Sequence, residues 1–218
     1  MPRAARPKPP PPTTVLFVRH GQTPTTGSVL PGRAKGLHLA DAGKRQAADA
    51  ADRIGALDGK VAAVYASPLE RARETAAPIA TRLGMPVKVE RGLLECDFGD
   101  WTGRSLKELA KLPEWATVQR YPSGFRFPNG ESFAEMQARI GDTVAKLAMR
   151  HPGQAVVAVS HADPIKAAVA SALGTHLDLF QRIVISPCSV TVVAYGVTGP
   201  IVLTVNSTSS DLASLRPS

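Results

Sequence analysis

The chain has 218 residues, 44% of them apolar, which fits one globular domain and excludes the composition of a disordered protein. No apolar run is long enough to cross a bilayer, and the basic, proline-rich start lacks the apolar core of a signal peptide, so we expect a cytoplasmic protein with no membrane partner. The net charge of +8 fits a nucleic-acid binder or an enzyme for anions; with aromatics at only 5% we favour small anions and expect no nucleic-acid partner.

The two ends of the chain differ in composition from its middle. Residues 1–13 are basic and proline-rich and are expected to form a disordered tail, and residues 207–218 are expected to form a flexible one. The segment between them, residues 14–206, is predicted to be one domain. Its two cysteines, Cys96 and Cys188, are too few for a disulfide framework and have no metal-type partner nearby, so we expect free thiols.

Strand-like and helix-like runs alternate along this domain. Apolar, β-branched runs predict strands at residues 15–18, 61–65, 87–89, 155–159, 183–185, 190–195 and 201–205. Helical patterns are found at residues 41–57, 68–83, 106–111, 132–150 and 164–173, with a polar insert over residues 96–130. The alternation predicts an α/β sandwich with parallel strands in the middle and an antiparallel edge near the end.

Charged side chains and imidazoles follow four of the predicted strands. Arg19 and His20 end the first strand, and Arg71 lies in the first turn of the helix after the second. Glu95 follows the third strand, and His161 ends the fourth. Because ligands of open α/β sheets bind beyond the carboxyl ends of the strands, we expect these five side chains to converge there.

Such a group of side chains suits phosphoryl transfer. Arginine offers a rigid fork of donors that matches phosphate oxygens, and a neutral imidazole can attack phosphorus and carry the phosphoryl group. Adjacent cations lower an imidazole pKa and keep the ring nucleophilic, while a carboxylic acid can protonate the leaving oxygen. With charge supplied by arginines and a second histidine, we expect neither a metal nor a cofactor.

Four stretches in order, "RHGQT", "SPLERARETA", "LLECDFGDWTG" and "SHADPIK", resemble the signatures of the histidine phosphatase superfamily, also called phosphoglycerate mutase-like. The resemblance covers roughly residues 15–195 and implies a three-layer α/β/α sandwich with a mainly parallel central sheet. The stretches "LPGRAKGLHLADAGKRQA" and "SHADPIKAAVASALG" are similar to an actinobacterial branch of phosphomutases and phosphatases, a name that says little about the reaction.

The resemblance also implies a role for each of the five residues. His20 corresponds to the phospho-acceptor, and Arg19 and Arg71 correspond to the phosphate pocket. Glu95 corresponds to the proton donor, with Asp97 as a close rival in the same stretch. His161 corresponds to the second histidine, which hydrogen-bonds the transferring phosphoryl group.

Five further residues are candidates for binding the substrate. Many members of the family have Asn where this chain has Thr26, a shorter donor. Gly21 is expected to let the backbone turn sharply, while Gln22 and Thr23 could bind phosphate or only order the loop. The backbone N–H of Ala162 is expected to face the phosphate.

The chain departs from the family pattern after the second histidine, where Ala162 and Asp163 replace a pair of glycines. An acid near a phosphate pocket should repel substrate, but Asp163 followed by Pro164 also matches a helix N-cap with proline at the first helical position, which we favour. Ser67 and Glu70 similarly match a capping box before Arg71. His38 is expected to lie in the loop after His20, and we favour the interpretation that its side chain does not contact the substrate.

Three functions remain open. The favoured one is a phosphomonoester hydrolase that acts on a small phosphorylated metabolite through a phospho-histidine. The alternative is a phosphomutase that returns the phosphoryl group to another hydroxyl, which the shortness of the insert disfavours. The third is a non-catalytic protein that binds a phosphate ligand, and in each case a homodimer is possible.

Overall fold

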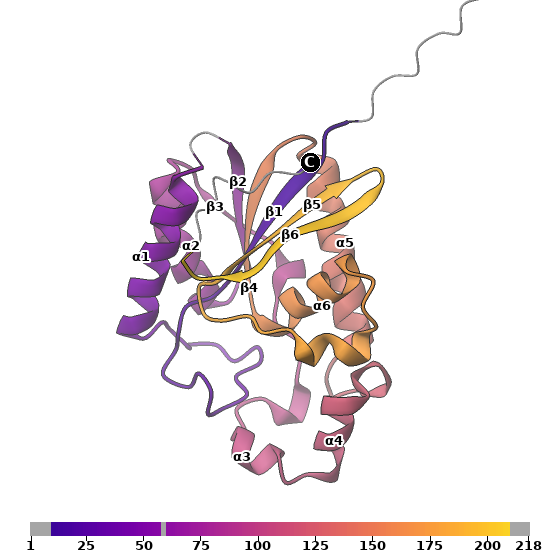
Figure 1. Ribbon diagram of the computed structural model, residues 1–218. Coiled ribbons are helices and arrows are strands. Elements are labelled where there is room, and N and C mark those ends of the chain that lie inside the picture. The colour runs from indigo at the N-terminus through magenta and orange to yellow at the C-terminus, as the bar shows by residue number, and fades with distance from the viewer. Residues whose placement is uncertain (1–9, 58–59, 210–218) are drawn as a thin grey trace, which may run out of the picture.

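The computed structural model describes residues 10–57 and 60–209 (Figure 1). The outer parts of both expected tails, residues 1–9 and 210–218, lie outside the described residues. The strands are β1 (Thr13–Arg19), β2 (Val61–Ala66), β3 (Val87–Val89), β4 (Ala155–Ser160), β5 (Val190–Gly196) and β6 (Gly199–Ser207). The α-helices are α1 (Asp41–Gly55), α2 (Glu70–Arg82), α3 (Leu106–Leu109), α4 (Pro113–Arg120), α5 (Phe133–Arg150) and α6 (Ala162–Ala172).

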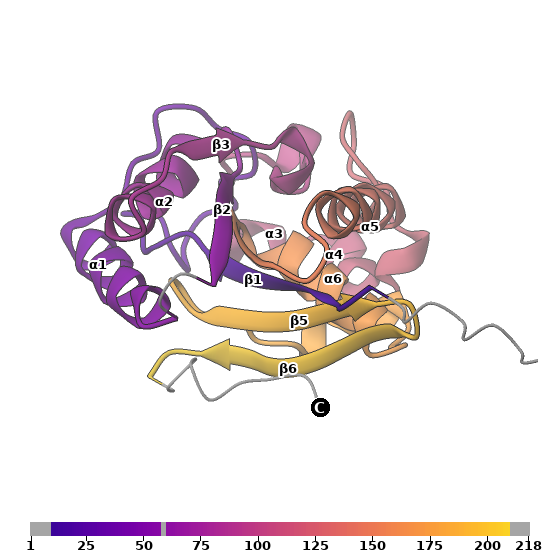
Figure 2. The ribbon, with the colours of Figure 1, turned by 90° about the horizontal axis from the view of Figure 1, so that it is seen from above.

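These strands form one six-stranded sheet in the order β3-β2-β4-β1-β5-β6. The first four are parallel, and β5 and β6 extend the sheet as an antiparallel edge. Helices α1 and α2 cover one face, and α5 and α6 cover the other (Figure 2). The predicted three-layer α/β/α sandwich with a mainly parallel sheet is therefore confirmed.

The central strand β1 supplies side chains to both layers of the core. Val15 and Phe17 pack in the apolar cluster that holds the buried faces of α5 and α6. Leu16 and Val18 pack on the opposite face, with α1 and α2. Since successive side chains of a strand point to opposite faces, an uninterrupted apolar run is what a strand buried on both faces requires.

The structure differs from the predicted elements in two places. Residues 183–185 are not a strand; they follow the 3₁₀ helix η4 (Leu177–Arg182) and belong to none of the six strands of the sheet. Helix α4 in the insert was not predicted, although Pro113 stands at its start, where proline is favoured. The start of α5 follows the sequence closely, because Ser132 and Glu135 form a capping box there.

The two ends of the domain are held in the sheet. The hydroxyl of Thr13, at the start of β1, donates to the backbone oxygens of Ala148 and His151 at 2.9 and 2.7 Å. At the other end β6 reaches Ser207. In residues 10–57 and 60–209 we find no helix with the length and apolar character needed to span a bilayer.

Two helical glycines provide a matched test of packing. A Cβ on Gly43 in α1 would overlap the carbonyl oxygen of Gln22, whereas a Cβ on Gly141 in α5 would meet no atom within 4 Å. We expect Gly43→Ala to lower the free energy of unfolding by about 1–3 kcal/mol through overpacking. Gly141→Ala should raise it by about 1 kcal/mol through helix propensity. Urea denaturation measures both, and a neutral Gly43→Ala would contradict the close approach of α1 to the loop.

Candidate active site

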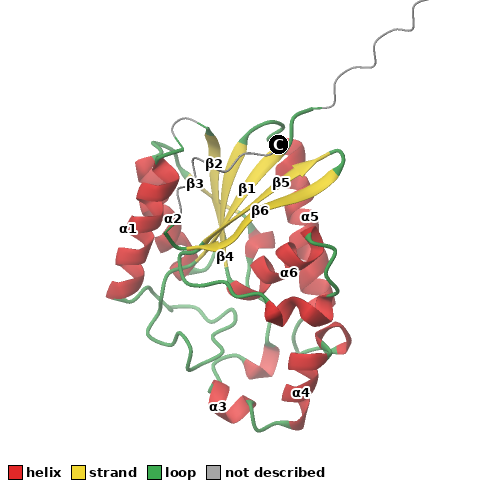
Figure 3. Ribbon diagram, viewed as in Figure 1, coloured by secondary structure: helices red, strands yellow, loops and turns green. Residues whose placement is uncertain are grey.

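The carboxyl ends of β1, β2 and β4 lie at one edge of the sheet, beside the loop over residues 20–40 and the segment that holds α3 and α4 (Figure 3). A cavity of about 360 Å³ opens there. Its lining includes six of the ten residues predicted for the site: Arg19, His20, Thr23, Thr26, Glu95 and Ala162. Arg71 and His161 lie behind this lining and are fully buried.

Gly21 and Gln22 are directed towards helices α1 and α2. The backbone N–H of Gly21 donates to the Thr75 hydroxyl, and that of Gln22 donates to the Gln46 side chain. A Cβ on Gly21 would lie 2.6 Å from the carbonyl oxygen of Gly43. The glycine is therefore required by this close approach to α1, and its φ is not in the left-handed region.

His20 follows β1 directly, and its ring is held between two partners. Its Nδ1 lies 2.8 Å from the carbonyl oxygen of Gly21, which places the ring proton on Nδ1. Its Nε2 therefore keeps a lone pair, and Arg71 Nε donates to it at 3.3 Å. Burial, with the charges of Arg71 and Arg19, lowers the pKa of His20 to about 3, so the imidazole is neutral at physiological pH.

The two arginines are only partly satisfied by protein groups. Arg71 donates from Nη2 to the Gly32 carbonyl at 2.6 Å, and Arg19 donates from Nη1 to the Ile185 carbonyl at 2.7 Å. Within the described residues, Arg71 Nη1 and Arg19 Nε are buried and have no hydrogen-bond partner. Unpaired buried donors are costly, and here they belong to two cations at one cavity, which is what an anion site offers.

His161 ends β4, next to β1 in the sheet. The backbone N–H of His20 donates to the Ser160 carbonyl, and the two imidazole rings lie 5.1 Å apart between centroids. Burial, followed by the charge of Arg71, lowers the pKa of His161 well below its usual value. Its Nε2 lies 2.8 Å from the Ser67 hydroxyl, and its Nδ1 is buried without a partner in the described part of the chain.

Ser67 thus has a different place from the one that its sequence pattern indicated. The expected capping box with Glu70 is absent; the N-cap of α2 is Leu69, which makes no side-chain cap bond. The Ser67 hydroxyl instead accepts from the Leu69 N–H at 3.5 Å and can donate to His161 Nε2. That bond would place the ring proton on Nδ1, the free position.

Glu95 is a buried carboxyl whose main chain is held by two further arginines. Its carbonyl oxygen accepts from Arg33 Nε at 2.9 Å and from Arg139 Nη2 at 3.3 Å, and both guanidinium groups also bind Glu131. Burial and the nearby charge of Asp163 raise the pKa of Glu95 to about 7. The carboxyl can therefore release and accept a proton near neutral pH.

Asp163 is not the N-cap of α6 that we expected. The helix begins at Ala162, and its N-cap is His161, two residues before Asp163, so Asp163 lies inside the first turn. Its carboxylate lines the cavity and pairs with Lys166 one turn later, at 3.4 Å. The negative charge of Asp163 at the cavity is thus partly neutralised by a lysine of the same helix face.

The rival candidates lie away from the cavity. Asp97 pairs with Arg33 and accepts from the Gly99 N–H, and it does not line the cavity, whereas Glu95 does. His38 is exposed and hydrogen-bonded to Glu74, which raises its pKa.

Thr26, in contrast, lines the cavity. Its hydroxyl accepts from the Thr23 N–H, so it also orders the loop.

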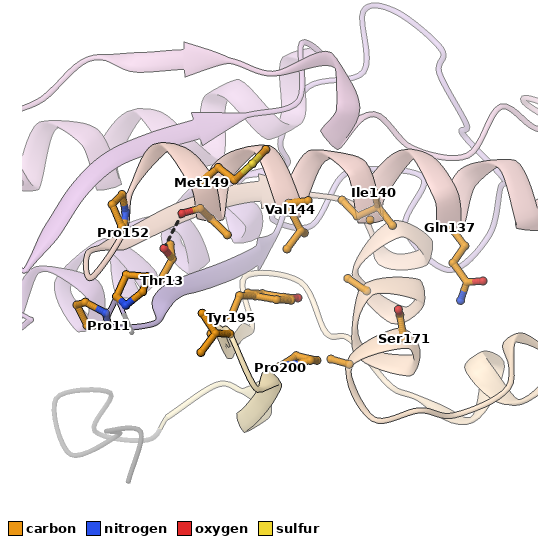
Figure 4. A pocket seen from close by; sticks show the side chains of 18 residues that line it. Pro11, Thr13, Gln137, Ile140, Val144, Met149, Pro152, Ser171, Tyr195 and Pro200 are labelled. Carbon is orange, nitrogen blue, oxygen red and sulfur yellow. Dashed lines mark hydrogen bonds between the residues drawn. The ribbon is translucent and has the colours of Figure 1, made fainter. Parts of the chain in front are cut away.

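A larger cavity of about 600 Å³ lies between α5, α6 and the β5–β6 turn (Figure 4). Ile140, Val144 and Tyr195 are among its lining residues, which include no acid, histidine, lysine or arginine. The groups capable of proton or phosphoryl transfer therefore gather at the smaller cavity.

Among the described residues no three His, Cys, Asp or Glu side chains are placed to hold a metal ion. Cys96 and Cys188 are free and buried, as expected.

The family model of the histidine phosphatase superfamily (branch 1) matches residues 15–208. This chain belongs to the histidine phosphatase superfamily. A bifunctional protein of Mycobacterium tuberculosis is 32% identical over 185 residues, which are 84% of this chain and 50% of that protein. The chain thus spans about half the length of the first curated relatives that it matches.

Other members of the superfamily match over more of their length. Phosphoserine phosphatase 1 of Hydrogenobacter thermophilus is 31% identical over 179 residues, covering 76% of this chain and 79% of that enzyme. A mycobacterial glucosyl-3-phosphoglycerate phosphatase has a similar structure, with a TM-score of 0.80 and 25% identity over 89% of this chain and 98% of the other. These similarities support the fold and the superfamily of the chain.

The raised pKa of Glu95 makes a prediction for stability. A carboxyl whose pKa is raised by folding stabilises the fold below its unfolded value near 4.5, and this contribution is lost as the pH rises through about 7. Between pH 5 and pH 8, the free energy of unfolding should therefore fall by about 1–3 kcal/mol more in the wild type than in Glu95→Gln. Urea denaturation at both pH values measures this difference, and parallel curves would mean that the carboxyl is not perturbed.

Proposed function

We propose that the protein is a metal-independent phosphomonoester hydrolase that transfers a phosphoryl group to His20 and then to water. The observation that carries the proposal is the set of buried donors at one cavity. Arg19 Nε, Arg71 Nη1 and His161 Nδ1 make up half of the six buried side-chain polar atoms that lack a partner in the described residues. All three belong to residues around His20, whose Nε2 keeps its lone pair.

In the first step, the lone pair of His20 Nε2 attacks the phosphorus atom, and the bond from phosphorus to the leaving oxygen breaks. The Gly21 carbonyl stabilises the positive charge that develops on the ring through its bond with Nδ1–H. Arg71, which holds Nε2 at 3.3 Å, turns its donors to the phosphoryl oxygens, together with Arg19 and His161. Glu95 gives its proton to the leaving oxygen.

In the second step, Glu95, now a carboxylate, takes a proton from water, and the oxygen of that water attacks phosphorus. The bond between phosphorus and Nε2 breaks, inorganic phosphate is released, and the free enzyme is restored. Glu95 suits both steps because its pKa of about 7 lets it hold the proton before the first step and accept one in the second.

Thr23, Thr26 and the Ala162 N–H are proposed to bind the phosphate or the loop that surrounds it. Thr23 is buried, and its hydroxyl lies 3.0 Å from that of Thr26. Gly21 and Gln22 are proposed to act through the backbone, since their N–H groups fix the loop on α1 and α2. A cytoplasmic location remains part of the proposal, as does a possible homodimer.

Loss of the imidazole of His20 tests the covalent intermediate. His20→Ala should lose at least about 10³-fold in kcat on an aryl phosphate, because the nucleophile is absent. His176→Ala is the matched control, since this histidine is exposed and outside the cavity. Acid quenching followed by mass spectrometry should find an acid-labile phosphate on His20 in the wild type. Full activity of His20→Ala, or loss of wild-type turnover on adding EDTA, would overturn the proposal.

The protonation of Glu95 determines how kcat/KM depends on pH. With Glu95 as the proton donor, kcat/KM should be high below pH about 7 and fall about tenfold per pH unit above it, because the proton is then lost. His20 stays neutral down to a pH of about 3 and sets no limit near neutrality. Glu95→Gln should lose this alkaline limb and most of the activity. Phosphorus-31 NMR of the products separates hydrolysis from isomerisation, so the same assay tests the mutase alternative.

A further inference from the structure

The outer part of the active-site cavity is lined by large apolar side chains from separate segments of the chain. Leu30 comes from the loop after His20, Phe98 and Leu106 come from the insert, and residues 183–185 come from the segment before β5. Val184 is 66% exposed, so part of its side chain is available to contact a bound molecule. This mouth is formed by Leu30, Phe98, Leu106, Ile183, Val184 and Ile185. Phe98 and Ile185 are buried, but the other four are partly or largely exposed and would lose water contact when an apolar group enters.

Apart from Arg19, His20 and Glu95, the polar side chains that line the same cavity contact one another. Lys166 Nζ lies 3.4 Å from the Asp163 carboxylate and donates to the Gln181 side chain at 3.0 Å. Thr23 and Thr26 are joined by their hydroxyls. A substrate rich in hydroxyl groups would therefore find few free partners beyond the phosphate, and its polar groups would be desolvated without compensation.

The charges at the cavity match a single phosphate group. Arg19, Arg71 and Lys166 line or adjoin the cavity as cations, and Asp163 cancels one of them, while Glu95 is mostly neutral below its pKa of about 7. Two positive charges remain for the two negative charges of a phosphate monoester. A further carboxylate or ammonium group on the substrate would be left without an opposite charge.

From this lining we infer that the substrate is the phosphate monoester of a compact, apolar, uncharged alcohol whose body packs against the mouth. The inference rests on the proposed hydrolase activity. It differs from the substrates in the names of the phosphoserine and glucosyl-3-phosphoglycerate phosphatases, which carry additional charged or hydroxyl groups.

Matched primary alkyl esters test the inference. We expect kcat/KM for n-hexyl phosphate to exceed that for glucose 6-phosphate and for O-phosphoserine by at least about tenfold. From propyl to hexyl phosphate, kcat/KM should rise about threefold to fourfold for each added methylene. Equal or faster hydrolysis of glucose 6-phosphate or phosphoserine would overturn the inference while leaving the proposed hydrolase intact.

Binding separates a failure of the inference from a failure of the proposed function. If no ester is hydrolysed, the hydrolase proposal fails. Calorimetry with hexylphosphonate and methylphosphonate still measures how much an apolar chain at the mouth adds to the affinity. Hexylphosphonate should bind at least about tenfold more tightly than methylphosphonate. Equal affinities would contradict an apolar body at this place.

Two exposed valines give a matched pair of variants. Val184 and Val197 are each 66% exposed, but Val184 lies at the mouth and Val197 lies in the β5–β6 turn at the other end of the sheet. Val184→Asp should reduce the ratio of kcat/KM for hexyl phosphate over glucose 6-phosphate by about tenfold, since it places a charge in the apolar wall. Val197→Asp should leave the ratio unchanged. An unchanged ratio in Val184→Asp would overturn the inference.

Discussion

The contact between Arg71 and His20 is the constraint on which the rest of the site depends. A guanidinium that is fully buried has to be surrounded by acceptors, and here it finds the Gly32 carbonyl and the imidazole nitrogen of His20. The carboxyl of Glu95 is nearby and favours the charged arginine, although it is itself half-protonated near neutral pH. An arginine so placed stabilises a neutral histidine and an incoming anion at the same time.

Glu95 extends this arrangement into the opposite layer of the fold. Arg139 belongs to α5 and donates to the carbonyl oxygens of Gly92, Leu94 and Glu95, so that helix fixes the whole turn before the carboxyl. Arg33, from the loop after His20, reaches the same oxygen of Glu95 and the same Glu131. The position of Glu95 is thus coupled to the loop after His20, and neither can shift without breaking partly buried ionic contacts.

The fold could be predicted from the sequence, because apolar runs are a local signal. The convergence of the residues that follow the strands could also be predicted, because the carboxyl ends of parallel strands lie at one edge of the sheet. Ser67 directly follows β2, so the same argument would have placed its hydroxyl beside His161. We did not predict this contact because Ser67 and Glu70 match a capping box. Asp163 was misplaced because a helix can start one residue before its expected cap. The contact of Arg33 with Glu131 spans 98 residues, and no local pattern predicts it.

The strand order has a consequence for how the protein folds. β1 is made first, yet its two neighbours in the sheet are β4 and β5, which come from the last third of the chain. Its apolar side chains therefore stay unpaired until most of the polypeptide is available, and the chain pays a large loop-closure entropy before the centre of the sheet forms. His20 and His161 meet through this same pairing of β1 with β4. The two histidines are thus brought together by a highly non-local pairing, and a chain cut before β4 holds only one of them.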